Sequence, residues 1–460
     1  MLRRFWKIFN GQTAAQPGSI LLYVIVFGTL AFSLVVIAIS GYAISEHQAA
    51  RYRVGQEQAF QIAEAGINYY RWHLAHNPTD YTDGTSTPGP YVHTYYNKDG
   101  VAIGQFSLTI TPPATGSTVV TIQSTGSITS EPNASRIIRV RLGFPSVANY
   151  AFLTNSDVWI GNNEIINGRF HANGGIRFDG TGNAPITSAM ATYTCQAVHG
   201  CNNLTKPGIW GQGGPTSFWS YPVPAWDFSA VTAKLEQMKT LTQADGIFLP
   251  SSGQQGWHLQ FNADGTVSIA KVLSTVAYKA GDTNSNKYFW SSIDIRTLGP
   301  ATIYPMPTSS YIYVDDQVWV DGTVNGRVTV GTSPGNSIMV DNNLVYTAKD
   351  GSDVLGLIAD QNILIPHDVP DTMEIDAALL AQNGAAKRYY YPGDLKDSLT
   401  IYGSVITNGL WTWSWVSQGG AIVSGFKNTD SIYDTNLTYN PPGGFPVGST
   451  YNIISWEEVK

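Results

Sequence analysis

The chain has 460 residues, of which 46 are glycine, 25 tyrosine and 13 tryptophan, and only 13% are charged. This composition favours a turn-rich β protein over a disordered chain, and the length allows two or three domains. The formal net charge of −7 at pH 7 gives no support to general nucleic-acid binding, so no nucleic acid is expected as a partner.

The first element is an apolar segment near the N-terminus. Residues 20–39 are almost wholly apolar, and no charged residue occurs between Lys7 and Glu46. About 20 apolar residues in a helix span a hydrocarbon core, and the basic residues before the segment predict a cytoplasmic N-terminal flank. A removable secretory signal is the alternative, but the apolar stretch is longer than usual for a signal and no A-x-A cleavage site follows. We expect a single pass through the cytoplasmic membrane, with the C-terminal bulk of the chain outside it.

Two short motifs around this segment resemble those of type IV pilin-like proteins. Gly18 and Ser19, which follow Gln16-Pro17, resemble the end of a class III leader. In that family a prepilin peptidase cuts after the glycine and methylates the new N-terminus. The sequence AFQIAEAGI at residues 59–67 resembles the end of the N-terminal helix of PilX-type proteins. The resemblance covers Gly18 to about Leu74 and implies a leader at residues 1–18, with Ala63, Glu64, Ala65 and Gly66 as the helix motif.

One position departs from the usual pilin pattern. Pilins carry a glutamate five residues after the cut, and this chain has Tyr23 there. That carboxylate lies in an apolar environment in a filament and is paired with a neighbouring N-terminal amine, because an unpaired buried charge is costly. The resemblance therefore implies an accessory or minor subunit. A membrane anchor that never polymerises is the alternative.

The helix is expected to continue beyond the membrane, over residues 19–78 in all. Apolar residues recur at spacings of three and four and form one stripe that requires a packing partner. The helix should close near Asn77-Pro78, because proline disfavours the helical conformation of the preceding residue. The stripe consists of Phe60, Ala63, Ile67, Tyr70 and Leu74.

Residues 79–145 are expected to form a small pilin-like β region. Alternating apolar residues at 106–110, 120–122 and 138–142 predict strands of an antiparallel meander, separated by Pro112-Pro113 and by residues 124–126. A sheet with one apolar face needs a second layer, and the helix stripe supplies it. Phe144-Pro145-Ser146 is the expected boundary.

Residues 146–460 show short apolar bursts separated by glycine, asparagine and aspartate. Strands this short, with no helix between them, predict a parallel β-helix, or β-solenoid, in which each coil covers the next. A β-sandwich is the alternative. Segments 326–330, 355–359, 374–381 and 401–405 resemble an uncharacterised extracellular domain, without assigned activity, that follows PilX-type N-termini. An insertion at about 181–310 is expected to contain a helix at 229–244 and a hairpin at Asp264-Gly265.

The only two cysteines, Cys195 and Cys201, lie six positions apart. Outside the membrane they are expected to form a local disulfide. A metal site with His199 would need a fourth ligand, and the spacing is not the tight C-x-x-C of zinc sites.

No catalytic motif is present. The sequence contains no G-x-S-x-G, H-E-x-x-H or P-loop pattern, so no catalytic residue, cofactor or metal is assigned. Asp315-Asp316 and the acids between Asp368 and Asp376 remain open between calcium ligands and solvated turns. The other acids considered as glycosidase pairs are Asp321, Asp341 and Asp360.

Three tryptophans near the C-terminus are the candidates for ligand contact. Trp411, Trp413 and Trp415 alternate, so in one strand they would share a face. Indole rings stack on sugars or bury in a partner surface. The alternative is that they pack under the final loop.

The sequence thus predicts a mainly β protein with a long N-terminal helix that acts as a non-enzymatic minor pilin or pilus-associated surface protein. Its expected partners are other pilin-like subunits, the pilus assembly machinery, the cytoplasmic membrane and surface glycans, and its place after processing is the pilus or cell surface. The alternative is a membrane-anchored β-helix protein that binds carbohydrate or acts on polysaccharide.

Overall fold

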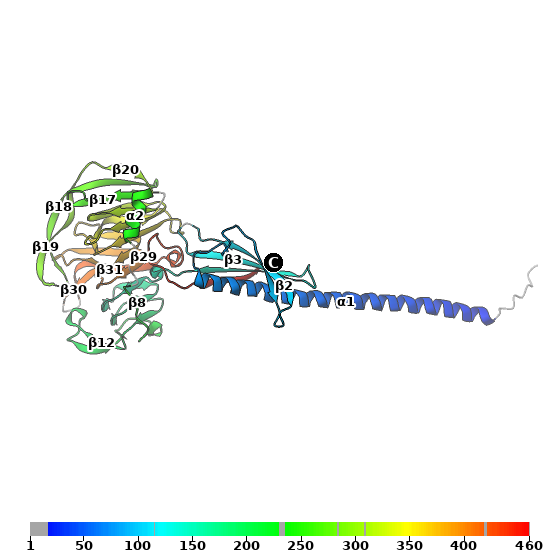
Figure 1. Cartoon of the computed structure of the whole chain (residues 1–460). Coiled ribbons are helices and arrows are strands. Elements are labelled where there is room, and N and C mark those ends of the chain that lie inside the picture. The colour runs from blue at the N-terminus through cyan, green and yellow to red at the C-terminus, as the bar shows by residue number, and fades with distance from the viewer. Residues whose placement is uncertain are drawn as a thin grey trace, which may run out of the picture. The chain divides into compact units, whose positions relative to one another are not determined.

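The computed structural model describes residues 17–114, 116–229, 235–282, 285–307, 310–417 and 421–459. The chain forms two compact units (Figure 1). Unit 1 comprises the chain up to Thr111, together with Thr121–Val140 and Ser455–Lys460. Unit 2 comprises Pro112–Val120 and Arg141–Ile454. The expectation of a mainly β protein with a long N-terminal helix is confirmed.

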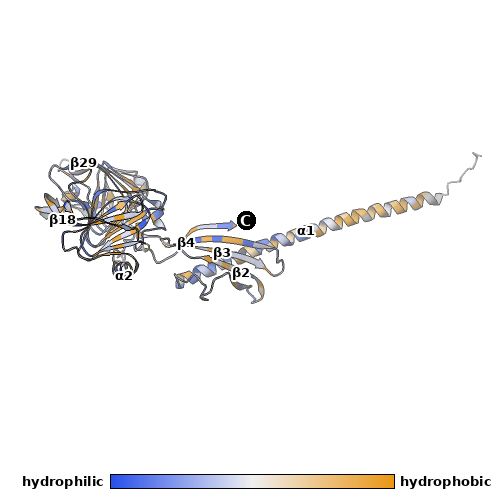
Figure 2. Cartoon of the chain, turned by 90° about the horizontal axis from the view of Figure 1, so that it is seen from above, coloured by the Kyte–Doolittle hydropathy of each residue, from blue (hydrophilic) through white to orange (hydrophobic). Residues whose placement is uncertain are grey.

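Helix α1 (Pro17–His76) is one continuous element of 60 residues. Its N-terminal half is apolar and exposed, as the orange stretch in Figure 2 shows, and it is long and apolar enough to cross a membrane. A signal sequence would meet the same criterion. The helix ends just before Asn77-Pro78. Residues 1–16 of the expected leader at 1–18 lie outside the described residues, and its last two residues belong to α1.

The C-terminal half of α1 packs against the sheet of unit 1. The expected stripe is confirmed for Ala63, Ile67, Tyr70 and Leu74, which are at most 3% exposed. Phe60 is only half-buried and lies against Trp456, with ring centroids 5.7 Å apart. One face of the sheet is apolar because buried and less buried residues alternate along β3.

The sheet of unit 1 contains the C-terminus of the chain. Its strand order is β1-β2-β3-β4-β32, and β1–β2 and β2–β3 pair antiparallel. Arg139 forms a 3.1 Å ion pair with Glu457, and Arg136 pairs with Glu458. The expectation that the solenoid extends to residue 460 is therefore wrong. The strands are β1 (Tyr91–Tyr96), β2 (Ala102–Thr111), β3 (Val119–Ile128), β4 (Ser135–Gly143) and β32 (Asn452–Val459).

Unit 2 consists mainly of parallel strand ladders. One ladder pairs, in order, β16 (Ile247–Leu249), β21 (Tyr311–Val314), β23 (Arg327–Thr332), β25 (Val354–Ala359), β27 (Thr372–Ala381) and β29 (Leu395–Thr407). A second pairs β17 (Gly256–Asn262), β22 (Val318–Val324), β24 (Ile338–Tyr346), β26 (Ile363–Ile365) and β28 (Ala386–Arg388). Alternate residues such as Val318, Val320, Ile338 and Val340 are fully buried and form the core.

The first strands of unit 2 pair with its last ones. In β29, Val405 is the partner of Phe152 in β5 (Phe152–Thr154), and β31 (Ile422–Tyr433) pairs in parallel with β7 (Glu164–Asn167). One ladder then continues from β5 through β8 (Phe170–Ala172), β11 (Ile186–Ser188) and β15 (Trp219–Ser220), and another from β7 to β10 (Thr181–Gly182). A separate three-stranded parallel sheet contains β6 (Val158–Ile160), β9 (Ile176–Phe178) and β14 (Ile209–Trp210). The pairings of β5 with β29 and of β7 with β31 thus join segments that are far apart in the sequence.

The predicted insertion at about 181–310 is not one interruption. Strands β10, β11, β14 to β17 lie in this range and join the parallel ladders. Three additions interrupt these ladders. The first is a hairpin of β12 (Thr192–Cys195) and β13 (Leu204–Pro207), the second is helix α2 (Leu235–Asp245), and the third is an antiparallel ribbon of β18 (Thr266–Asp282), β19 (Ser285–Leu298) and β20 (Thr302–Pro305). The expected hairpin at Asp264-Gly265 joins β17 to β18.

The remaining elements are short. Strand β30 (Ser414–Val416) pairs antiparallel with β31. The 3-10 turns are η1 (Val147–Asn149), η2 (Ala197–His199), η3 (Thr216–Phe218) and η4 (Thr435–Thr438).

Candidate functional site

The AEAG motif of α1 is a close packing contact with the sheet of unit 1. Ala63 and Gly66 are buried, Ala65 is half-buried, and Glu64 is exposed. A Cβ atom added to Gly66 would lie 2.4 Å from Ser124 Oγ and 2.8 Å from the Phe106 ring. Small residues at these positions let the helix approach the strands closely. Only the small members of the motif are thus required by this packing, whereas Glu64 faces solvent.

The N-terminal half of α1 carries the second candidate surface. Its large side chains between Ile20 and Ile44 are 43% exposed or more. Tyr23, at the position where pilins have glutamate, is 61% exposed. The helix includes the backbone of Gly18 and Ser19, but the side chain of Ser19 is not among those that the structure describes. Cleavage between them stays a prediction.

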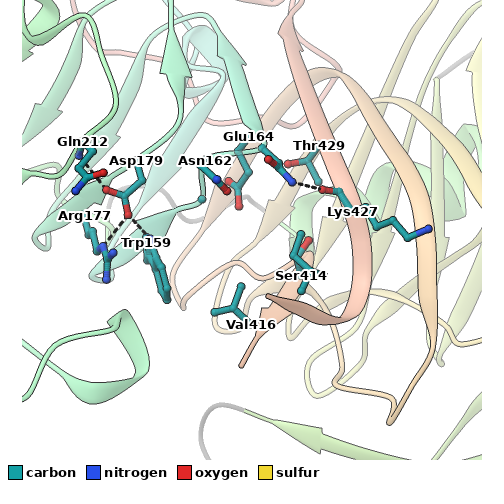
Figure 3. Close-up of a pocket in the computed structure, with 13 residues that line it drawn as sticks. Trp159, Asn162, Glu164, Arg177, Asp179, Gln212, Ser414, Val416, Lys427 and Thr429 are labelled. Atoms are coloured by element: carbon teal, nitrogen blue, oxygen red, sulfur yellow. Dashed lines mark hydrogen bonds and ion pairs between the residues drawn. The ribbon is translucent and has the colours of Figure 1, made fainter. Parts of the chain in front are cut away.

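A pocket of about 300 Å³ opens on the surface of unit 2. Figure 3 shows its wall of Trp159, Arg177, Asp179 and Gln212 facing a second wall of Ser414, Val416, Thr429 and Lys427. In the first wall, Trp159 and Arg177 come from β6 and β9, and Asp179 and Gln212 follow β9 and β14, whereas the second wall comes from β30 and β31. The pocket therefore forms where the first and last strands of unit 2 meet.

Asp179 fixes the aromatic wall of this pocket. Its Oδ2 accepts hydrogen bonds from Trp159 Nε1 at 2.9 Å and from Arg177 Nε at 2.8 Å. The Arg177 guanidinium lies over the Trp159 ring, 4.1 Å from its centroid, as a cation–π contact. Because β6 and β9 pair in register, Trp159 and Arg177 are direct partners. The indole is thus held in one orientation.

Glu164 lies beside this wall. Desolvation raises its pKa to about 7, although a hydrogen bond to the Gly161 backbone acts in the opposite direction. At neutral pH the carboxyl group is therefore divided between the protonated and ionised forms, and it either donates or accepts a hydrogen bond. The pocket offers a polar ligand an indole, amides such as Asn162, and this carboxyl group.

A second pocket of about 350 Å³ adjoins the first and shares Trp159, Glu164, Ser414 and Val416 with it. Its other lining residues include His199, Gly200 and Trp415. Burial lowers the pKa of His199, which favours the neutral imidazole at pH 7.

Trp411 and Trp413 are 4% and 3% exposed and belong to the core of unit 2, where Trp411 stacks on Phe152 with ring centroids 3.8 Å apart. Both also border the second pocket. Their burial favours the alternative that they pack inside the protein, and ligand contact by these two residues stays a prediction. Trp415 is half-buried, donates a hydrogen bond to the Arg388 carbonyl at 3.1 Å, and borders the second pocket.

The predicted disulfide is confirmed. Cys195 and Cys201 are bonded across the turn between β12 and β13. Both sulfur atoms are therefore unavailable to a metal ion. The His199 side chain is buried beside them, and neither of its ring nitrogens has a hydrogen-bond partner among the described residues.

The acids considered for calcium have protein partners. Asp316 accepts hydrogen bonds from the backbone and side chain of Ser252, at 2.8 and 2.7 Å. Asp376 accepts from Lys349 Nζ at 2.8 Å and from the backbone of Tyr346 at 2.9 Å. These contacts favour structural roles for both, Asp316 in a bend after β21 and Asp376 as a buried residue within β27.

The pocket residues Trp159, Arg177, Asp179 and Glu164 were not among the predicted site residues. The signal that identifies two of them is the repeated burst Val158-Trp159-Ile160 and Ile176-Arg177-Phe178. Since flanking residues point inward, the two central side chains point outward and stack on neighbouring strands.

Comparison with known proteins gives little further information. No family model matches the chain, and no curated protein matches it. Among solved structures, the competence-associated pilin ComZ from Thermus thermophilus is 16% identical over 88% of this chain and 97% of its own, with a TM-score of 0.27. A TM-score this low supports no argument about the fold or the function of this chain, so the function has to be inferred from its own residues.

Proposed function

We propose that the chain is a minor subunit of a type IV pilus-like filament, held in the cytoplasmic membrane before assembly. The observation that carries the proposal is helix α1, whose N-terminal half exposes apolar side chains while its C-terminal half is buried on a sheet. A helix of this kind needs an apolar surrounding for its free half, either lipid or the equivalent helices of other subunits. One element thereby serves as anchor and as assembly surface.

Tyr23 favours a minor position. A filament interior built from many copies would need an acid to pair with each neighbouring N-terminal amine. This chain has no charged residue between Lys7 and Glu46 that could take that role. A subunit present once or sparsely needs no such repeated pairing. Other pilin-like subunits and the assembly machinery are the proposed partners.

Processing after Gly18 is the first expected result. Mass spectrometry of the protein from the native cell should find a mature chain that starts at a methylated Ser19, and Gly18→Val should leave the leader attached. Cross-linking in cells should then capture other pilin-like subunits through α1. A mature chain starting beyond Ile39 would indicate an ordinary secretory signal and would contradict the proposal. Correct processing without any cross-linked subunit would favour the stationary anchor.

We infer that unit 2 is a parallel β-helix displayed by this anchor. The support is the set of parallel ladders, with alternate residues buried inside, since a sandwich of two antiparallel sheets has antiparallel neighbours instead. A displayed solenoid is suited to adhesion. Surface glycans are the proposed ligands, because the Trp159 pocket combines a fixed indole with amide and carboxyl groups.

Trp159→Ala should weaken glycan binding by about 30-fold in Kd, which corresponds to about 2 kcal/mol for loss of an aromatic anchor. Trp290→Ala is the matched control, because Trp290 in β19 is 71% exposed and does not line either of the two pockets. Binding is measured on a glycan array and then by calorimetry. Equal affinity of both variants for the glycan would exclude this pocket as the glycan-binding site. Release of reducing ends by the wild type, abolished by Glu164→Gln, would instead establish the polysaccharide-active alternative.

A further inference from the structure

We propose that His258, Asp321 and Asp341 form a site for one divalent transition-metal ion of the zinc or manganese class. The site lies in unit 2, outside the Trp159 pocket, and does not depend on the pilus proposal. None of the three residues was assigned to a metal from the sequence. Their ligand atoms all lie within 4.8 Å of one another.

Three neighbouring strands bring these side chains together. His258 is in β17, Asp321 in β22 and Asp341 in β24, and these strands pair in parallel in that order. Leu259 and Val320 point into the core, so the residues adjacent to them point to the outer face. The register between β22 and β24 shifts after Val320, which places Asp341 in a bulged segment. Bulges commonly re-aim side chains at functional sites.

The spacing fits metal ligands better than direct hydrogen bonds. His258 Nε2 lies 3.6 Å from Asp321 Oδ1 and 3.8 Å from Asp341 Oδ2. Both distances exceed those of ordinary hydrogen bonds. Bonds of about 2.0–2.2 Å in a tetrahedron place ligand atoms about 3.3–3.6 Å apart. The two distances from His258 therefore already lie at or just above the tetrahedral range, and all three ligand atoms lie within 4.8 Å of one another.

The second observation is unpaired oxygen atoms. Asp321 Oδ1 and Asp341 Oδ1 are buried and have no hydrogen-bond partner among the described residues. Asp321 is only 7% exposed, as is His258. Buried acceptors in native proteins almost always have a partner, because leaving one without it carries a large desolvation cost. A bound cation would satisfy Asp321 Oδ1, and it would satisfy Asp341 Oδ1 as well if Asp341 binds it through both carboxylate oxygens.

The charge balance also favours a cation. Among the described residues, no lysine or arginine forms an ion pair with Asp321 or Asp341. A divalent ion with neutral imidazole balances both carboxylates.

The ligand set selects the class of metal. Calcium and magnesium prefer oxygen ligands throughout, whereas imidazole favours zinc and related transition metals, and the two carboxylates also suit manganese. Trp319, the register partner of His258, is buried with Met339 and Val272 in an apolar cluster on the same face. Such an apolar surround limits water access and strengthens ligand binding.

The test uses the untagged full chain in detergent. After EDTA treatment, the protein should rebind about one equivalent of Zn²⁺ by calorimetry, with a rise in the unfolding temperature of unit 2. Asp341→Asn should weaken binding at least 100-fold, and the unfolding temperature of this variant should not respond to EDTA. Asp371→Asn is the matched control, because Asp371 is an exposed acid with its side chain 73% accessible. Binding should weaken as pH falls from 7 to 5, since protons compete for His258 and Asp341.

An imidazolium that bridges two aspartates is the competing explanation. It predicts no tight Zn²⁺, Mn²⁺ or Co²⁺ binding and no effect of EDTA on the unfolding temperature, and either result overturns the proposal. Should Asp341→Asn fail to fold, His258→Gln provides a second variant. The d–d absorption of a Co²⁺-loaded wild-type chain then reports imidazole and carboxylate ligation directly, and a spectrum of aqueous Co²⁺ would count against the site.

Discussion

Replacing Gly126 by alanine is expected to destabilise unit 1 by about 2–3 kcal/mol, in the range of overpacked cores. Gly126 lies in β3 under α1. A Cβ atom there would lie 2.1 Å from the Ala59 carbonyl oxygen and 2.4 Å from the Ala63 nitrogen. Both are backbone atoms of the helix, so no side-chain rotation relieves the clash. The helix must move away from the sheet.

Hydrogen exchange of the full chain in detergent measures this effect, because it reports local opening of α1 and β3. Gly299→Ala is the control, since its nearest neighbour would be 3.6 Å away. It should leave exchange in unit 1 unchanged. Equal protection of β3 in Gly126→Ala and wild type would show that the helix packs less closely on the sheet than these distances indicate.

Asp394→Ala is expected to cost unit 2 about 3–5 kcal/mol, because it leaves a buried arginine without its counter-charge. Arg388 is fully buried and pairs through Nη2 with Asp394, and the same nitrogen donates to the His367 carbonyl at 3.1 Å. Its Nε and Nη1 have no partner among the described residues. The carboxylate of Asp394 is thus the principal compensation for the buried Arg388 charge in unit 2.

Chemical denaturation followed by tryptophan fluorescence measures this loss. Asp397→Ala is the matched control, because Asp397 is 64% exposed and pairs with Lys427 at 2.9 Å on the surface. An exposed pair of this kind contributes about 0–1 kcal/mol. If both variants lose the same small amount, the Arg388 environment is more hydrated than its burial indicates.

Local patterns in the sequence predict which segments form helices and strands better than they predict which strands pair with one another. The apolar segment and the stripe of α1 follow from helical periodicity, and both appear in the structure. The alternating residues of β2 and β3 likewise identify strands. Two cysteines in a short loop made the disulfide the natural expectation.

Pairings between distant segments are not encoded locally. Nothing in residues 152–154 specifies that Val405 to Thr407 will be their partners, because any short apolar burst fits any parallel ladder. For the same reason the sequence left Trp411 and Trp413 open between ligand contact and packing inside the protein, and the structure places both in the core of unit 2. His258 became a candidate only when β17 was placed beside β22.

The last strand, β32, completes the sheet that begins with the first strands of the chain. A polypeptide shortened by early termination or by proteolysis near Ser455 would leave β4 as an unpaired edge strand and would expose Phe60, the ring partner of Trp456. The C-terminal residues must therefore be synthesised before unit 1 reaches its final form. Completion of this sheet thus couples the folding of the N-terminal helix unit to synthesis of the whole chain.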